Sequence, residues 1–218
     1  MTAGGARGRG GEPAAGWNGT ERRAGTAAVT GGLVLAAGQG TRFGADSKLL
    51  AKLDGRPVLE WAVQAPCGVS ELQRVVVVLG HRAEEIMAAA DLGRAEPVVC
   101  EQWADGQSAS LRCGLAALAG MERVIVTLGD QPRMTPRVIS LFLDQPGGTR
   151  AVYAGRPGHP VVLGPAEIAA AREVAGDQGA RELLRGGPVI EVGHLCSGRD
   201  VDTTEDLEAL RHEARAVI

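Results

Sequence analysis

The chain has 218 residues, of which 44% are hydrophobic and only 3% are aromatic. This length suits one domain whose core is filled by Val, Leu, Ile and Ala, and it is short for two full domains. The net charge of -3 lacks the basic excess of a nucleic-acid-binding protein, so we expect no nucleic-acid partner.

The apolar segments and cysteines of the chain narrow its class further. No apolar run approaches the roughly 20 residues that span a bilayer, and the N-terminus lacks the apolar stretch of a secretory signal. We therefore expect a cytoplasmic protein with no membrane partner. The cysteines show no zinc-ligand spacing, and we expect buried or unreactive thiols rather than metal or redox roles. They are Cys67, Cys100, Cys113 and Cys196.

Residues 1–29 differ in composition from the rest of the chain. They are rich in Gly, Ala and Arg and contain almost no large apolar side chains. Such a segment cannot bury enough surface to offset its ordering entropy. We predict a disordered extension over residues 1–29, with an upstream start-site artefact as the alternative, and a single domain over residues 30–218. A nucleic-acid-binding tail is disfavoured because Glu12 and Glu21 interrupt the arginines.

From residue 30 onward, short apolar runs alternate with helical patterns. The runs that predict strands lie at 32–37, 74–80, 96–100 and 123–130. The helical patterns lie at 58–65, 83–90 and 107–118. Because most of these runs are continuously apolar, both faces of their sheet must be covered. We predict a three-layer, Rossmann-like α/β fold with a mostly parallel sheet and helices on both faces, in which ligands bind at the carboxyl ends of the strands.

The C-terminal third of the chain is less regular. Short strands are predicted at 151–154, 160–163 and 189–192. Helices are predicted at 136–143, 165–174, 180–185 and 204–214. The last helix has Thr203 as its N-cap candidate and Asp206 three residues later, which predicts a capping box.

The glycine-rich loop after the first strand is the most informative motif. It reads LAAGQGTRFGADSKLL over residues 35–50. Its glycines allow the backbone to approach a phosphate closely, and N–H groups turned inward form an anion-binding nest. Arg42 and Lys48 add two cations, so we predict that the loop holds a nucleoside triphosphate. An ordinary glycine turn would leave both cations unexplained.

Two common phosphate-binding loops have a different spacing. A Walker A loop has its lysine directly after a glycine and before Ser or Thr. Here Lys48 lies four residues beyond Gly44, and Leu49 follows it. The dinucleotide fingerprint needs a third glycine where Phe43 stands. Both alternatives are therefore disfavoured.

Asp130 belongs to the sequence GDQP over residues 129–132, which comes directly after the predicted strand Val124–Leu128. A carboxylate at the ligand edge of a sheet is well placed to hold Mg²⁺, which prefers one or two carboxylates together with phosphate oxygens and water. Gly-Asp-x-Pro is also good turn chemistry, so a structural turn is the alternative.

The pattern Leu-Ala-Ala-Gly-x-Gly-x-Arg-x-Gly followed by a lysine resembles the signature of the molybdenum-cofactor nucleotidyltransferases and their sugar-nucleotide relatives. The resemblance covers residues 32–210 and implies the nucleotide-diphospho-sugar transferase fold. It implies catalytic roles for Arg42, Lys48 and Asp130. The loop residues that it implies bind the nucleotide are Leu35, Ala36, Ala37, Gly38, Gly40, Arg42 and Lys48.

The resemblance also assigns residues outside the loop. Gly106 and Ser110 match a segment near the base and ribose, although a helix start capped by Ser108 is equally compatible. Asp202 matches a second Mg²⁺ ligand beside Asp130, whereas Asp200 and Asp206 can be interpreted as capping residues. The residues that match acceptor-binding segments are His159 and Arg181, with a structural turn and a solvated helix residue as the alternatives. Trp61 and Trp103 are interpreted as packing residues.

The best match within the family is the cytidylyltransferase of the molybdenum–molybdopterin cofactor. The loop begins Leu-Ala-Ala-Gly, whereas guanylyl enzymes usually have Leu-Ala-Gly-Gly. The Gly-His-Pro-Val and Asp-x-x-Gly-Ala-Arg segments also belong to the cytidylyl branch. Many members have Ser in place of Gly40 and Met in place of Phe43, so a guanylyl or other nucleotidyltransferase stays open.

The implied reaction transfers CMP from CTP to the phosphate of molybdopterin, with Mg²⁺ as cofactor and pyrophosphate as the leaving group. A molybdoenzyme or its maturation chaperone is a possible recipient of the product. Two other classes share the loop: an NAD(P)H-dependent oxidoreductase of the nicotine-blue type, and a non-catalytic molybdenum-cofactor-binding chaperone. The pair Asp130 and Asp202 favours nucleotidyl transfer, since hydride transfer needs no metal carboxylates.

Overall fold

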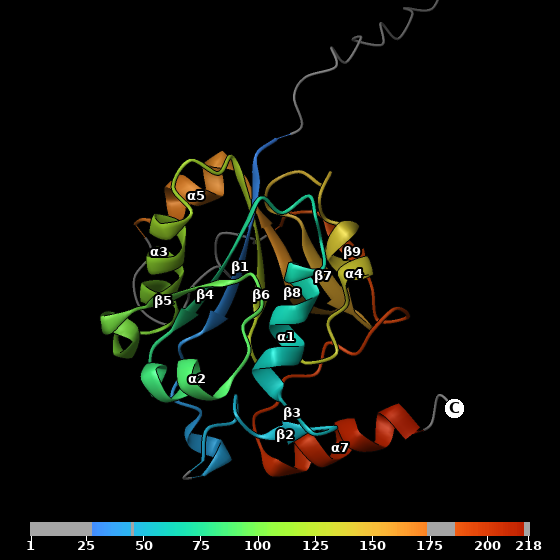
Figure 1. Ribbon diagram of the computed structural model, residues 1–218. Coiled ribbons are helices and arrows are strands. Elements are labelled where there is room, and N and C mark those ends of the chain that lie inside the picture. Colours follow the sequence, from blue (N-terminus) through green and yellow to red (C-terminus); the bar gives the residue numbers. More distant parts are fainter. Residues whose placement is uncertain (1–27, 45, 174–185, 216–218) are drawn as a thin grey trace, which may run out of the picture.

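The computed structural model describes residues 28–44, 46–173 and 186–215 (Figure 1). At its centre lies a seven-stranded sheet in the order β5-β4-β1-β6-β8-β7-β9. Helices α1, α2 and α4 cover one face of the sheet, and α3 and α5 cover the other. The predicted three-layer α/β fold is confirmed. The expected disorder of residues 1–29 falls almost entirely outside the described residues.

The half of the sheet that carries the glycine-rich loop is parallel. Strand β1 lies between β4 and β6, and β5 extends this half at its edge. The bounds are β1 Thr30–Ala36, β4 Arg74–Leu79, β5 Glu96–Val99 and β6 Arg123–Leu128. The predicted strands are thus confirmed to within two residues.

The other half of the sheet contains the antiparallel pairs. Strand β8, Arg156–Leu163, runs antiparallel to both β6 and β7, Arg150–Tyr153. Strand β9, Val189–Glu191, runs parallel to β7. A separate hairpin, β2 Lys52–Leu53 and β3 Arg56–Pro57, was not predicted, because two-residue strands leave no periodic pattern.

The helices begin at the predicted residues; α1 and α7 extend beyond the predicted ends, and α2, α3, α4 and α5 end earlier. Their bounds are α1 Val58–Cys67, α2 Ala83–Ala89, α3 Gln107–Ala117, α4 Pro136–Ser140, α5 Pro165–Ala171 and α7 Thr204–Arg215. Two 3₁₀ helices, η1 Thr41–Phe43 and η2 Glu101–Asp105, follow β1 and β5. Helix α4 ends before the predicted residue 143 because the chain continues as tight turns, with Phe142 N–H bonded to the Ile139 carbonyl. The helix predicted at 180–185 lies outside the described residues. Within the described part of the chain, no helix has the length and apolar character needed to cross a bilayer.

The continuous apolar strands are explained by two hydrophobic clusters, one on each face of the sheet. In β1, Val34 and Ala36 pack under α1, whereas Leu33 and Leu35 pack under α3. Successive side chains of a strand point to opposite faces, so every position in β1 is buried. This rigid double-sided core holds the end of β1, and therefore the loop that follows it.

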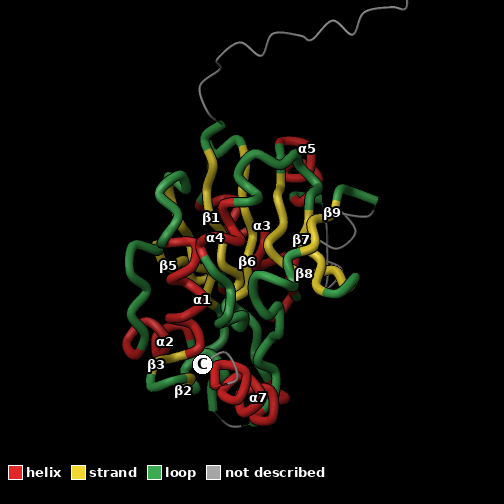
Figure 2. The backbone as a smooth tube through the Cα atoms, turned by 90° about the vertical axis from the view of Figure 1, so that its right-hand side faces the viewer, coloured by secondary structure: helices red, strands yellow, loops and turns green. Residues whose placement is uncertain are grey.

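Helix α7 is held against the β2–β3 hairpin at the carboxyl end of the sheet (Figures 1 and 2). The predicted capping box is present. Asp206 N–H donates to Thr203 Oγ1 at 3.2 Å, and Thr203 N–H donates to Asp206 Oδ2 at 2.9 Å. Val201, just before the helix, is fully buried with Leu210 in a small third cluster. The segment between Val201 and α7 is therefore fixed at both ends.

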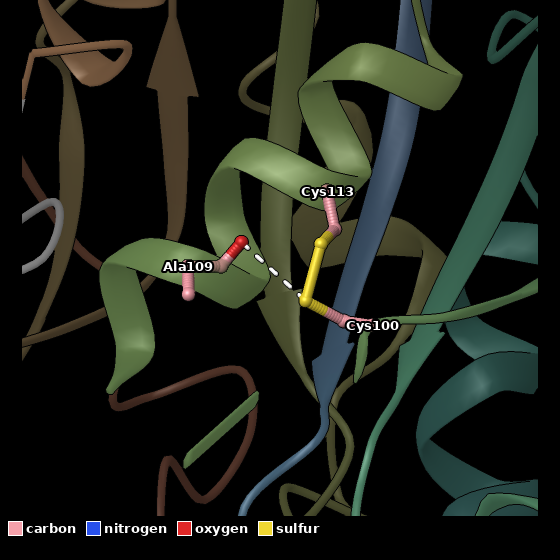
Figure 3. The surroundings of a disulfide bond; sticks show 3 residues. All are labelled: Cys100, Ala109 and Cys113. Carbon is pink, nitrogen blue, oxygen red and sulfur yellow. Dashed lines mark hydrogen bonds between the residues drawn. A yellow bond between two sulfur atoms is a disulfide. The ribbon is translucent and has the colours of Figure 1, made fainter. Parts of the chain in front are cut away.

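A disulfide joins Cys100, between β5 and η2, to Cys113 in α3 (Figure 3). The expectation of unreactive thiols was wrong for these two residues. Their Cα atoms are 5.9 Å apart, within the range that a disulfide bridges, a proximity created by packing rather than by sequence spacing. Cys67 and Cys196 are free thiols, and burial raises the pKa of each.

We expect the Cys113→Ser variant to lose about 2–3 kcal/mol of unfolding free energy, because the disulfide restricts a short loop in the unfolded chain. Cys100 Sγ lies 3.7 Å from the Ala109 carbonyl oxygen, so a thiol there has a ready acceptor that limits the loss. Urea unfolding followed by circular dichroism measures the difference. Cys67→Ser, which removes a free thiol, is the control; equal midpoints for Cys113→Ser and wild type would contradict the prediction.

Candidate functional site

The glycine-rich loop forms one wall of a cavity of about 500 Å³ at the carboxyl ends of β1 and β6. This volume is suited to a small-molecule ligand. The other wall comes from η2 and the first turn of α3. The structure thus brings together distant residues to which the sequence assigns nucleotide binding. Those that line the cavity are Leu35, Ala36, Ala37, Gly38, Gly40, Lys48, Gly106 and Ser110.

The backbone of the loop is open toward this cavity. Gly40 has φ +65°, a left-handed conformation that favours glycine. The amide groups of Gly38, Gln39 and Gly40 donate no hydrogen bond to any residue in the described part of the chain. Free amides beside a cavity are donors for an anion. The loop therefore has the conformation and the unused donors of a phosphate-binding nest.

Three charged side chains meet beside the loop. Lys48 Nζ lies 2.5 Å from Asp130 Oδ2 and 2.9 Å from Asp202 Oδ1. Val201 N–H donates to the Asp130 carbonyl at 2.9 Å, which fixes the two aspartate segments side by side. The two carboxylates that the sequence assigns to a metal are thus adjacent, and the ammonium of Lys48 lies between them.

Asp130 is placed by the glycine that precedes it. A Cβ on Gly129 would lie 2.6 Å from the Cβ of Ala36, so no other residue fits without movement of the loop strand. Gly129 N–H also donates to the Leu35 carbonyl at 2.9 Å. The GDQP motif is therefore more than a turn, because it attaches Asp130 to the strand that leads into the loop.

The charge balance of the site depends on Lys48. Burial alone would lower the pKa of Lys48, but the charge of Asp130 and hydrogen bonds to Asp130 and Asp202 outweigh it and raise that pKa. Asp130 Oδ1 is buried and accepts no hydrogen bond from the described residues. A buried carboxylate oxygen without a donor is costly unless a ligand satisfies it.

These features fit a divalent metal that is shared with a substrate. The described residues contain no cluster of three His, Cys, Asp or Glu side chains able to hold a metal ion. Asp130 and Asp202 supply two carboxylates, and Mg²⁺ is commonly held by one or two carboxylates plus phosphate oxygens. Lys48 occupies the cationic position between them when phosphate and metal are absent.

Arg42 lies at the rim of the site. Its side chain is 72% exposed, and its Nη2 lies 2.7 Å from Asp202 Oδ2. It does not belong to the cavity wall that the other loop residues form. To bind a triphosphate, Arg42 must turn inward from Asp202.

Asp200 is a site residue that sequence reasoning missed. Its interpretation as a capping residue is wrong, because Asp206 forms the cap and Asp200 instead accepts a 2.7 Å hydrogen bond from Gln131 Nε2. Burial, and then the charge of Asp130, raise the pKa of Asp200 to about 6. The sequence feature that could have identified Asp200 is its position two residues before Asp202. In an extended chain, side chains two residues apart point to the same side.

Trp103 lies in the wall of the nucleotide cavity, so its interpretation as a packing residue alone was too narrow. Its ring packs edge-on against His81, with 5.3 Å between the centroids. Ser108 does not cap α3; its Oγ is buried without a partner among the described residues. Trp61 does pack, with its Nε1 donating to the Leu53 carbonyl.

His159 lies in a second, larger cavity beside the first. This cavity shares Gln107 and Leu128 with the nucleotide cavity. The other predicted acceptor residue, Arg181, lies outside the described residues. The two cavities are adjacent, and Asp130 lies in the wall of the first.

Comparison with known proteins identifies the family. A model described as the MobA-like NTP transferase domain matches residues 32–194. The chain belongs to the MobA-like NTP transferase family. The predicted resemblance to nucleotidyltransferases is thereby confirmed.

Individual relatives are functionally diverse. Nicotine blue oxidoreductase of Paenarthrobacter nicotinovorans is 34% identical over 194 residues, which cover 82% of this chain and 95% of that protein. The bifunctional protein GlmU of Cutibacterium acnes is 34% identical over 79% of this chain, but the match spans only 38% of GlmU.

Among solved structures, Rv0371c from Mycobacterium tuberculosis H37Rv superposes with a TM-score of 0.74 at 30% identity, covering 86% of this chain and 99% of that one. Another structure of Rv0371c, a complex with manganese, has a TM-score of 0.69 at 27% identity and covers 84% of this chain and 98% of that one.

We expect the Lys48→Met variant to bind Mn²⁺ in the absence of nucleotide about tenfold or more tightly than wild type. The variant removes an ammonium that competes for the same carboxylate oxygens and repels a divalent cation. Titration followed by electron paramagnetic resonance measures the affinity. Adding Asp202→Asn should abolish the gain, and unchanged Mn²⁺ affinity in Lys48→Met would contradict the prediction.

Proposed function

We propose that this protein is a molybdenum cofactor cytidylyltransferase, which transfers CMP from CTP to the phosphate of a molybdopterin-type cofactor and releases pyrophosphate. The observation that carries the nucleotidyl-transfer step is the cluster of Lys48, Asp130 and Asp202 beside the phosphate-binding loop. The cytidylyl and molybdopterin assignments rest on the loop sequence and on the Gly-His-Pro-Val segment.

The chain's own side chains position the reacting groups. The amides of the loop, with Lys48 and Arg42, hold the triphosphate, and Trp103, Gly106 and Ser110 line the cavity that receives the base and ribose. Such preorganised donors stabilise the charge that develops during transfer. Asp130 and Asp202 would hold Mg²⁺, which would supply positive charge to the phosphate oxygens.

The transfer needs no covalent enzyme intermediate. A phosphate oxygen of the acceptor forms a bond to the α-phosphorus of CTP, and the bond from that phosphorus to the bridging oxygen of the β-phosphate breaks. Pyrophosphate leaves with the electron pair of that bond. The enzyme contributes by aligning the two substrates in adjacent cavities and by balancing charge. We place this reaction in the cytoplasm, with a molybdoenzyme or its maturation chaperone receiving the product.

A second candidate function is an NAD(P)H-dependent reduction of the nicotine-blue type. The nicotine blue oxidoreductase is 34% identical over nearly its whole length, which favours this alternative. The paired carboxylates with Lys48 between them argue for nucleotidyl transfer, because hydride transfer has no use for such a pair. A guanylyl enzyme and a non-catalytic molybdenum-cofactor chaperone are the further alternatives.

One assay separates these functions. Purified protein is given Mg²⁺ and molybdopterin with CTP, GTP, ATP or NAD(P)H, and pyrophosphate release and nicotinamide oxidation are both measured. We expect pyrophosphate with CTP only. Oxidation of NAD(P)H without pyrophosphate would establish the second candidate, and binding of the cofactor without either product would establish a chaperone.

We expect Lys48→Ala and Asp130→Ala each to lower turnover at least a hundredfold. Lys48→Ala removes a cation that would act on the transferring phosphate, and Asp130→Ala removes a carboxylate that would hold the metal. Circular dichroism should show an intact fold in both variants. Lys52→Ala removes an exposed lysine nearby and should keep full activity. Near-normal rates in either of the first two variants would overturn the proposed mechanism.

A further inference from the structure

The larger cavity, of about 1020 Å³, lies next to the nucleotide cavity. Its walls come from β7, β8 and residues 193–200. Because Gln107 and Leu128 belong to both cavities, a molecule in the larger one lies beside the nucleotide. This is the position of the acceptor, and the lining of the cavity indicates the chemistry of that acceptor.

Positive charge dominates this lining. Arg150, Arg156 and Arg199 line the cavity, whereas Asp200 is its one carboxylate among the described residues. Arg199 is paired with Glu213 at 3.3 Å, and Asp200 is bonded to Gln131.

Within the described ranges, the side chains of Arg150 and Arg156 form no hydrogen bond and no ion pair. Two cationic groups in the same cavity therefore have no counter-charge among the described residues.

The nearby carboxylate of Glu191 is already used. It accepts hydrogen bonds from the backbone N–H groups of Gly193, Gly155 and Ala154, and these bonds lower its pKa. Glu191 therefore fixes the turn between β7 and β8 rather than neutralising Arg156. The negative charge of Glu191 thus stabilises this turn, and among the described residues it forms no ion pair with Arg150 or Arg156.

Arg150 gives a second, independent observation. Its Nε is buried, yet it donates to no described residue. A buried donor without an acceptor is unfavourable, and a guanidinium presents N–H groups in a fork that fits carboxylate and phosphate oxygens. An anionic ligand in the cavity would satisfy Nε and the charge together.

The positions of the strands separate this anion site from the reacting centre. Strand β7 lies two strands away from β6 in the sheet, roughly 10 Å at the usual strand spacing. Arg150 is opposite Val161, which is opposite Val126, so Arg150 also lies four residues behind the level of Asp130, roughly 13 Å along the strand. The group that Arg150 binds is therefore different from the phosphate that reacts near Asp130.

We propose that Arg150 forms an anion subsite that binds a second acidic group of the acceptor, with Arg156 adding positive charge to the same cavity. The acceptor class is a small molecule with a reactive phosphate at one end and a carboxylate, phosphate or comparable anion roughly 16 Å away, the distance that about 10 Å across the sheet and about 13 Å along the strand give together. This inference rests on the proposed function, since it names the substrate class of the same site. The cavity volume is large enough for a molecule of this length.

The test compares Arg156→Gln and Arg150→Lys with Arg137→Gln, which removes an exposed arginine of α4 outside the cavity. We expect the KM for molybdopterin to rise roughly tenfold to a hundredfold in the first two variants, the loss typical of a charged hydrogen bond. The Kd for CTP should stay unchanged in all three. An unchanged KM in both cavity variants would overturn the subsite.

If the wild-type protein transfers no nucleotide, the proposed function is overturned but the subsite is not. A binding measurement then tests the subsite directly. Inorganic phosphate is titrated into the full chain by calorimetry. We expect a phosphate site at the subsite in wild type, and its loss in the double variant Arg150→Lys, Arg156→Gln. Identical titration curves for wild type and double variant would overturn the subsite.

Discussion

The site depends on one electrostatic constraint: two carboxylates from distant parts of the chain are held within hydrogen-bond distance of one ammonium. Without a cation between them, Asp130 and Asp202 would repel each other across a partly buried space. Lys48 supplies that cation in the protein alone. A metal with bound triphosphate would replace it and release Lys48 toward the phosphates, so one side chain serves both states.

The fold satisfies this constraint by placing three segments at one sheet edge. Strands β1 and β6 are parallel neighbours, so their carboxyl ends bring the loop and Asp130 together. Asp202 is positioned by its neighbour Val201. The Val201 side chain packs in the small cluster under α7, and its N–H donates to the Asp130 carbonyl. The two-sided core under β1 fixes the end of the strand from which the loop starts.

The sequence predicted the parts of this arrangement that depend on local pattern. Continuous apolar runs predicted the buried strands, and the spacing of Thr203 and Asp206 predicted the cap of α7. The Cys100–Cys113 bond and the inward orientation of Asp200 were missed. Both arise from contacts between segments that only tertiary packing brings together, and a pattern within one segment carries no such information.

The two cavities differ in the balance of charge among their lining side chains, and this difference bears on how each substrate would bind. In the nucleotide cavity, Lys48 is already balanced by Asp130 and Asp202, so a triphosphate must bring its own metal to displace it. In the larger cavity, Arg150 and Arg156 have no ionic partner in the described part of the chain, which is why an anion is proposed to bind there. Under the proposed function, charge compensation would couple nucleotide binding to the metal, whereas the acceptor would bind through the arginines of the larger cavity. Selectivity for the acceptor then resides in β7 and β8, away from the loop that defines the family.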